Sequence, residues 1–111
     1  MKEVKYTVKW TARFKKDYKL AIKRNLDVKK LQTIVEKLAN GERLPDENYD
    51  HPLGGNFSGH RECHIEPDWL LIYFYEKDVL VLTLSRTGTH SDLFGKEQRK
   101  RTVAMIVSLV S

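Results

Sequence analysis

Hydrophobic and polar residues alternate at the start of the chain and then change to a helical spacing. Residues 4–10 alternate as a strand does, with β-favouring side chains among them. Apolar residues then recur every three or four positions over residues 11–25 and again over 27–40, with lysines on the remaining faces. Thr11 and Asp27 are residue types that cap helix N-termini. The pattern predicts one strand followed by an antiparallel pair of helices.

The second half of the chain predicts a loop and three further strands. Residues 42–57 lack periodicity and hold prolines, glycines and acidic residues, as loops do. Three strand-like runs follow at 59–66, 69–75 and 79–85, separated by short polar turns. The predicted order is strand, helix, helix and three strands. This order is typical of an α+β fold in which a helical hairpin packs on one face of a small, mostly antiparallel sheet.

The C-terminal end of the chain differs in character from the rest. Residues 96–101 are mostly charged and basic, and an apolar stretch follows them. Apolar side chains at helical spacing allow a C-terminal helix there, although the many β-branched residues would suit a strand equally well. We treat residues 1–95 as one domain and residues 96–111 as an extension whose role is open.

The composition indicates a single small domain. The chain has 111 residues and one cysteine, Cys63, so an intramolecular disulfide is excluded and a reducing compartment is favoured. No apolar run approaches the ~18 residues of a membrane span. These features predict a cytoplasmic protein with no membrane partner.

The net charge of +5 is unevenly distributed. Residues 1–30 hold eleven Lys/Arg against three acidic residues, a net +8, whereas the remaining residues hold nine against twelve, a net −3. A basic helical face attracts polyanions such as RNA. A lysine-rich face is equally compatible with simple solvation, so charge alone leaves both interpretations open.

Titratable side chains gather in residues 59–69. As a strand, this stretch places alternate side chains on opposite faces. One face receives His60, Glu62, His64 and Glu66. The other face receives Arg61 and Cys63. Because burying unpaired charge costs roughly several kcal/mol or more, we expect the first face to look into water or a cleft and to be a candidate site.

Metal binding and cysteine chemistry are two alternatives for this stretch. His60, His64 and Asp68 recur every fourth residue, as metal ligands on a helix do. Pro67 and the strand-like alternation argue against a helix there. Cys63 lies on the opposite strand face from His64, which favours a core residue over a nucleophile. The sequence therefore predicts no metal and no cofactor.

Metal-free acid–base chemistry on RNA is the third interpretation. A neutral and a protonated imidazole can act as base and acid near neutral pH. The base takes the proton of a ribose 2′-hydroxyl, the resulting alkoxide attacks the adjacent phosphorus, and the acid protonates the departing 5′-oxygen. Arg61 or Arg86 could stabilise the phosphate, and Phe94 could stack on a base. Each also has a structural alternative, since arginines pair with carboxylates and phenylalanines fill cores.

Three stretches resemble the successive motifs of the YafQ branch of the RelE/ParE toxin superfamily. They are residues 50–53 (DHPL), 59–73 (GHRECHIEPDWLLIY) and 86–95 (RTGTHSDLFG). They agree with the family motifs in order and spacing, and the resemblance spans residues 3–95. It implies a helical hairpin on an antiparallel sheet, in agreement with the fold predicted from the pattern. It does not cover residues 96–111.

The resemblance also implies a function. Members of this family are small toxins of bacterial type II toxin–antitoxin pairs. They are endoribonucleases that cut mRNA on the translating ribosome, and a cognate antitoxin silences them. The implied partners are the antitoxin, the ribosome and mRNA, without a small-molecule cofactor. The rival is a non-enzymatic toxin of the same fold that inhibits a target such as gyrase, because a fold never settles function.

Five functional positions carry over from the family. They are His51, His64, Asp68, His90 and Phe94. The resemblance makes His90 the expected general acid and His51 the leading candidate for the base. Asp68 is expected to orient an imidazole or to act as the base itself. His64 is expected to hold the scissile phosphate or to change the protonation of a neighbour.

Overall fold

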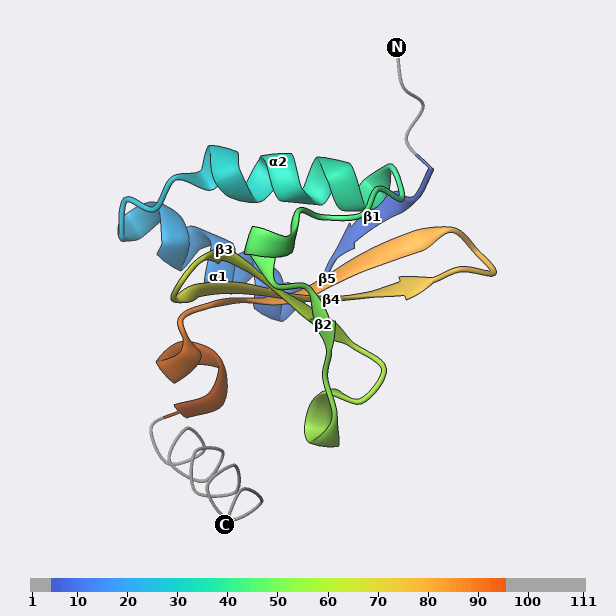
Figure 1. The fold of residues 1–111 in the computed structure, drawn as a ribbon. Coiled ribbons are helices and arrows are strands. Elements are labelled where there is room, and N and C mark those ends of the chain that lie inside the picture. The colour runs from blue at the N-terminus through green and yellow to red at the C-terminus, as the bar shows by residue number, and fades with distance from the viewer. Residues whose placement is uncertain (1–4, 96–111) are drawn as a thin grey trace.

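The computed structural model describes residues 5–95 (Figure 1). Its two long helices are α1 (Ala12–Lys23) and α2 (Val28–Ala39). The strands are β1 (Thr7–Trp10), β2 (His51–Pro52), β3 (Arg61–Glu66), β4 (Trp69–Glu76) and β5 (Val81–Gly88). Two 3-10 turns, η1 (Asp46–Asn48) and η2 (Gly55–Phe57), lie on either side of β2. Residues 90–95 are helical.

The five strands form one mixed sheet in the order β1-β5-β4-β3-β2. β3, β4 and β5 form an antiparallel meander, and β2 adds to it antiparallel to β3. Only β1 runs parallel to its neighbour, β5. A parallel pair needs a long crossover, and the chain between these two strands contains both long helices. The predicted α+β fold with a mostly antiparallel sheet is therefore confirmed.

The main core lies between the two helices and one face of the sheet. Phe14 of α1 is fully buried there, as are Leu71 and Leu84 of the sheet, and Leu31 of α2 is 2% exposed. Thr11 caps α1 as predicted, because its hydroxyl accepts the Phe14 N–H at 3.0 Å. The apolar stripes of both helices thus cover the same sheet face.

The opposite face of the sheet has a smaller apolar group. Leu70, Ile72 and Leu93 are buried in it, and Phe94 packs against them. In Figure 1 the helical segment 90–95, which follows β5, lies on the side of the sheet away from α2. Because Leu70 and Ile72 are the register partners of the titratable side chains of β3, this less covered face is also the one that carries the chemistry.

The structure differs from the predicted elements in detail. It adds the two-residue strand β2 within the predicted loop 42–57, because a pair of residues is too short to show alternation. Strand β5 begins and ends later than the predicted 79–85. The predicted C-terminal helix in 96–111 lies outside the described residues. Within the described part of the chain, no helix has the length and apolar content that a membrane span requires.

Candidate active site

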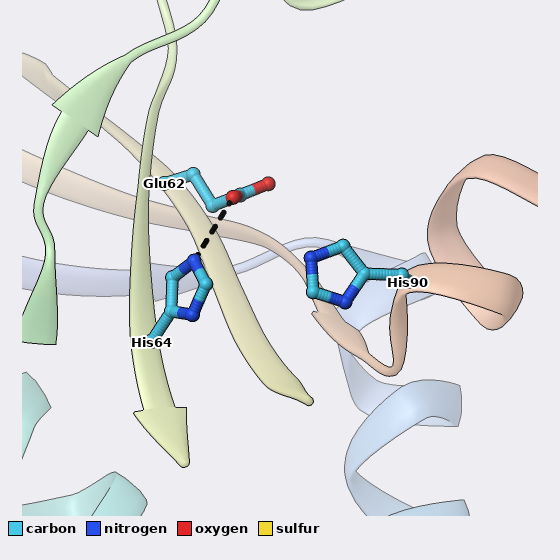
Figure 2. Close-up of side chains that lie close together, drawn as sticks. All are labelled: Glu62, His64 and His90. Atoms are coloured by element: carbon cyan, nitrogen blue, oxygen red, sulfur yellow. Dashed lines mark ion pairs between the residues drawn. The ribbon is translucent and has the colours of Figure 1, made fainter. Parts of the chain in front are cut away.

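A buried carboxylate, Glu62, lies at the centre of the site. Its side chain is 6% exposed, and its Oε1 lies 3.5 Å from Nε2 of His51 and 3.6 Å from Nε2 of His64. Figure 2 shows Glu62 and His64 on one strand, with the ring of His90 facing them from another segment. The alternation predicted that Glu62 and His64 share a face, and the structure confirms it. Three imidazoles from distant parts of the chain therefore gather around one carboxylate.

The short strand β2 brings His51 to this point. His51 is the register partner of Glu62, and its Nδ1 lies 2.8 Å from the carbonyl oxygen of Tyr49. Because a carbonyl only accepts, Nδ1 carries the hydrogen and Nε2 faces Glu62. Tyr49 has the left-handed φ of 47°, uncommon without glycine. Its ring lies 4.9 Å from that of His51 and 5.6 Å from that of His64, centroid to centroid, and so covers both imidazoles.

His90 approaches the same point from the start of the helical segment 90–95. Its ring centroid lies 5.8 Å from that of His64. Oδ1 of Asp68, in the turn between β3 and β4, lies 2.5 Å from Nδ1 of His90 and accepts its backbone N–H at 2.9 Å. Since a carboxylate accepts, Nδ1 carries a hydrogen. The other ring nitrogen then faces the cluster, as Figure 2 shows.

The segment that carries His90 is fixed by a reciprocal cap. The N–H of Thr89 donates to Asp92 Oδ2 at 2.9 Å, and the N–H of Asp92 donates to Thr89 Oγ1 at 3.0 Å. Arg24, which follows α1, donates to both Asp92 oxygens, at 2.5 and 3.2 Å. Chiefly because of this arginine, the pKa of Asp92 is lowered to about 2. A Cβ on Gly88 would lie 3.0 Å from Asp92 Oδ2, so a side chain there would displace the cap.

The two arginines expected to bind phosphate are engaged elsewhere. Arg61 is the register partner of Tyr73, on the helix-covered face, and its Nε lies 3.2 Å from Oδ1 of Asp50. The structure therefore separates Arg61 from the imidazoles, as the strand alternation requires. Nε of Arg86 lies 2.7 Å from Oδ2 of Asp17 in α1. Both arginines are thus paired with carboxylates, which was the structural alternative to phosphate binding.

Three further candidate residues lie outside the group of imidazoles around Glu62. Phe94 is half-buried on the same sheet face as the site, edge to face with Phe57 at 5.9 Å. His60 packs against Phe57 and Phe74, with centroid distances of 5.7 and 4.8 Å, and not against the other imidazoles. Cys63 is fully buried, and this burial raises the pKa of its thiol. Cys63 is thus a core residue, as predicted.

The strand alternation placed Glu62 on the candidate face without giving it a role, and Tyr49 was not expected at the site. For Glu62 a signal existed, because it shares a strand face with His64 and a buried carboxylate needs partners. For Tyr49 there was none. It lies in an aperiodic loop, where no periodic pattern predicts the direction of a side chain.

One group of side chains in residues 5–95 is compact enough to hold a metal ion. The donor atoms of Glu62, His64 and His90 all lie within 4.8 Å of one another. Two imidazoles and a carboxylate suit Zn²⁺ or Cu²⁺. This set differs from the helical set of His60, His64 and Asp68 that the sequence suggested, and only His64 belongs to both.

Comparisons with known proteins agree with this fold and site. A family model described as bacterial toxin of type II toxin–antitoxin system, YafQ, matches residues 6–95. The mRNA interferase toxin YafQ of Escherichia coli K12 is 43% identical over 89 residues, which cover 79% of this chain and 95% of that protein.

Solved structures are similar over the same part of the chain. The crystal structure of the E. coli DinJ–YafQ toxin–antitoxin complex has a chain with a TM-score of 0.75 and 41% identity, covering 83% of this chain and 100% of that chain. A metal-bound toxin from Helicobacter pylori has a TM-score of 0.76 and 40% identity, covering 80% and 99%. With the helical hairpin and the sheet, these matches define a bacterial toxin with a RelE-like fold. The chain belongs to the YafQ family of type II toxin–antitoxin toxins.

Proposed function

We propose that this toxin cuts mRNA on the ribosome, by a metal-independent attack of the ribose 2′-hydroxyl on the adjacent phosphodiester. The kinship with the E. coli mRNA interferase supports endoribonuclease activity. The observation that carries the mechanism is the convergence of His51, His64 and His90 around Glu62. The reaction needs a base, an acid and a stabilised phosphate, and imidazoles supply the first two near neutral pH. Its place of action is the cytoplasm, where ribosomes are.

His90 is the general acid in this mechanism. Asp68 accepts both the ring Nδ1 hydrogen and the backbone N–H of His90, which fixes the orientation of the ring. Nε2 is then the atom that delivers a proton to the departing 5′-oxygen. Because Oδ1 of Asp68 already accepts two hydrogens, an orienting role suits Asp68 better than that of a base.

His51 is the base. Its Nδ1 is held by the Tyr49 carbonyl, so its Nε2 exchanges protons on the side where His64 lies. The ring centroids of His51 and His64 are 6.3 Å apart, and those of His64 and His90 are 5.8 Å apart. His64 therefore stands between base and acid, where the phosphate of a bound ribonucleotide has to lie.

Further contacts with RNA come from residues outside the imidazole group. Phe94 presents a half-buried ring on the same sheet face and stacks on a substrate base. Exposed lysines of α1, among them Lys15, Lys16 and Lys19, attract ribosomal RNA. Arg86 binds phosphate only if RNA displaces it from Asp17.

A cognate antitoxin is the second macromolecular partner. The similar E. coli structure is a DinJ–YafQ toxin–antitoxin complex. Since this chain belongs to the same family and matches that toxin over its whole length, we assign it an antitoxin that silences the nuclease. An acidic or amphipathic segment would suit the basic N-terminal part of the toxin.

The test is the variant His90→Ala. We expect mRNA cleavage on ribosomes to fall by at least ~100-fold, since general acid–base catalysis contributes about 10²–10⁴, while the melting temperature stays nearly unchanged. Cleavage ends mapped in expressing cells should carry a 5′-hydroxyl and a cyclic or 3′-phosphate. His60→Gln is the matched control, because His60 is an imidazole outside the cluster and its loss should leave the cut sites in place. DNA damage without mRNA cleavage would instead indicate the gyrase-directed rival.

A second candidate function of the same site is to bind a metal ion, which would hold the toxin in an inhibited state. It is favoured by the close approach of the donor atoms of Glu62, His64 and His90, and the similar H. pylori toxin is metal-bound. A transition metal there would occupy the nitrogens that the proposed reaction needs. Added Zn²⁺ should therefore inhibit cleavage and a chelator should restore it. Activity that disappears on chelation, with ribosomes kept intact by Mg²⁺, would contradict both the inhibited state and the metal-free mechanism.

A further inference from the structure

We propose that Tyr49 binds the substrate, and that its ring stacks on the base of the nucleotide that supplies the attacking 2′-hydroxyl. The proposal deepens the function proposed above and rests on it. Tyr49 is not among the positions that the family resemblance carried over. What supports the proposal is the exposure of the residue, its contact with two of the imidazoles and the way its backbone is held.

Tyr49 differs from the other tyrosines in its exposure. It is the most exposed large hydrophobic residue within 5–95, at 65%. The other four tyrosines of the chain belong to the main core or pack against it, namely Tyr6, Tyr18, Tyr73 and Tyr75. Single exposed hydrophobic side chains are common on protein surfaces, so exposure alone does not indicate a ligand. The position of this ring does.

The ring of Tyr49 lies beside the base of the proposed reaction. Its centroid is 4.9 Å from that of His51 and 5.6 Å from that of His64. Because His51 takes the proton of the 2′-hydroxyl, the nucleotide that carries this hydroxyl has to lie next to both rings. Aromatic side chains bind nucleobases of any identity, since every base has a π-face. Phe94, in the segment that carries His90, is then left for the nucleotide on the other side of the cut.

There is room for a base beside Tyr49. The residue also borders a hollow of about 550 Å³, whose walls include Arg43, Asp46, Asp50 and Arg61. Ligand clefts have volumes of roughly 300–1,000 Å³. In this hollow the two arginines face the two carboxylates, at 4.0 and 3.2 Å. Because its charges are paired in this way, the hollow suits an uncharged nucleobase better than a phosphate.

The backbone that presents the ring is held without help from the ring itself. Asn48 donates its side-chain amide to the carbonyl of His64 at 2.8 Å, and the N–H of Tyr49 donates to the carbonyl of Asp46 at 3.0 Å. The carbonyl of Tyr49 accepts the Nδ1 hydrogen of His51 at 2.8 Å. Tyr49 has φ 47° and ψ 50°, a left-handed conformation that asparagine and glycine adopt more easily than tyrosine. A tyrosine kept at such a position beside the site indicates a role for its ring.

Three variants at this position separate stacking from a structural role. Tyr49→Phe keeps the ring and is the matched control, so it should cleave mRNA on programmed ribosomes like the parent. Tyr49→Leu keeps an apolar side chain without the ring and should lower kcat/KM roughly 5- to 150-fold, as expected for the loss of one stacked base. Tyr49→Asn should lose activity to a similar degree and yet melt no lower than the parent, because asparagine fits the left-handed conformation. A structural role of the ring would instead lower the melting temperature of both variants that lack it.

A second measurement changes the RNA instead of the protein. An mRNA that lacks the base on the 5′ side of the mapped cut, but keeps its ribose 2′-hydroxyl, should slow the parent by the same factor and slow Tyr49→Leu no further. Removal of the base on the 3′ side is the control, where the loss caused by Tyr49→Leu should persist in full. A leucine variant that cuts like the parent would overturn the proposal. So would an equal loss with and without the 5′ base, because the ring would then act on the imidazoles alone.

Binding to an uncleavable mRNA distinguishes this proposal from the proposed function. With 2′-deoxy sugars in the codon of the ribosome's open decoding site, the proposed reaction has no nucleophile. The parent should bind these ribosomes more tightly when all bases of the codon are present than when the stacked one is removed, and Tyr49→Leu should bind both equally. A parent that shows this difference but cuts no RNA would refute the nuclease and leave the stacking contact standing. Equal binding by the parent would overturn the contact, whether or not it cuts RNA.

Discussion

The two faces of the sheet differ in how they treat polar groups. On the helix-covered face, the polar atoms of two large aromatic side chains have specific partners. Trp69 donates its indole N–H to Thr87 at 3.0 Å, and Tyr75 donates to the Leu38 carbonyl at 2.7 Å, with its pKa raised to about 12 mainly by burial. On the opposite face, imidazoles share one carboxylate and remain accessible. One strand serves both purposes, because alternate residues of β3 face opposite sides.

The largest effect on stability should come from the helix-covered face. Phe14 is fully buried and lies 4.9 Å from Trp10 and 6.3 Å from Tyr18, ring to ring. Replacing it with alanine should cost about 3–5 kcal/mol of unfolding free energy, because the transfer and cavity terms add. Urea denaturation measures this loss. The contrast between the two sheet faces would be contradicted if Phe14→Ala left the free energy of unfolding unchanged. It would also be contradicted if a site variant such as His90→Ala lowered that free energy by as much.

A smaller effect should come from the cap beside His90. The Arg24 hydrogen bond holds the pKa of Asp92 at about 2, below its ordinary value of 3.8, so the carboxylate stabilises the folded state when it is ionised. That contribution is fully present above pH ~4 and is lost as the pH falls toward 2. Asp92→Asn should therefore cost about 1 kcal/mol near neutral pH, typical of a lost cap, and almost nothing near pH 2.

Acid titration of unfolding for the parent and the asparagine variant measures this difference. Cleavage should also decline in the variant, because Asp92 fixes the segment that carries His90. A constant stability difference between the two proteins down to pH 2 would show that Asp92 acts through packing and not through its charge.

The smallest effect on the fold should come from the basic face of α1. Lys15, Lys16 and Lys19 are exposed. Changing all three to glutamate should leave unfolding within about ±0.5 kcal/mol per site, as for most surface substitutions. Ribosome binding should weaken and lose part of its salt dependence, because fewer counterions are released. Sedimentation with ribosomes at increasing salt tests this. Unchanged binding would exclude this face of α1 from the contact.

The fold was predictable from sequence wherever one face of an element is buried. Helical spacing predicted α1 and α2, and period-two alternation placed Cys63 in the core and His64 in the site. Neither the helical nor the period-two spacing can be detected in a segment that has few packed residues. Strand β2 has two residues, and the loop before it is aperiodic, so the approach of His51 to Glu62 depends on a pairing that no local pattern records.

Sequence patterns predicted which residues form the site better than they predicted how those residues are arranged. The family motifs supplied His51, His64, Asp68 and His90, and these residues do come together. Ion pairs between distant segments could not be predicted from the sequence, because a charge pattern does not show which carboxylate an arginine will pair with. Arg86 meets Asp17 across 69 positions of the chain.

The bond between Arg24 and Asp92 links two segments 68 residues apart. Arg24 closes the helix whose lysines face outward, and Asp92 lies two positions after the proposed acid. The salt bridge therefore ties the C-terminal end of α1 to the segment that holds His90 against Asp68.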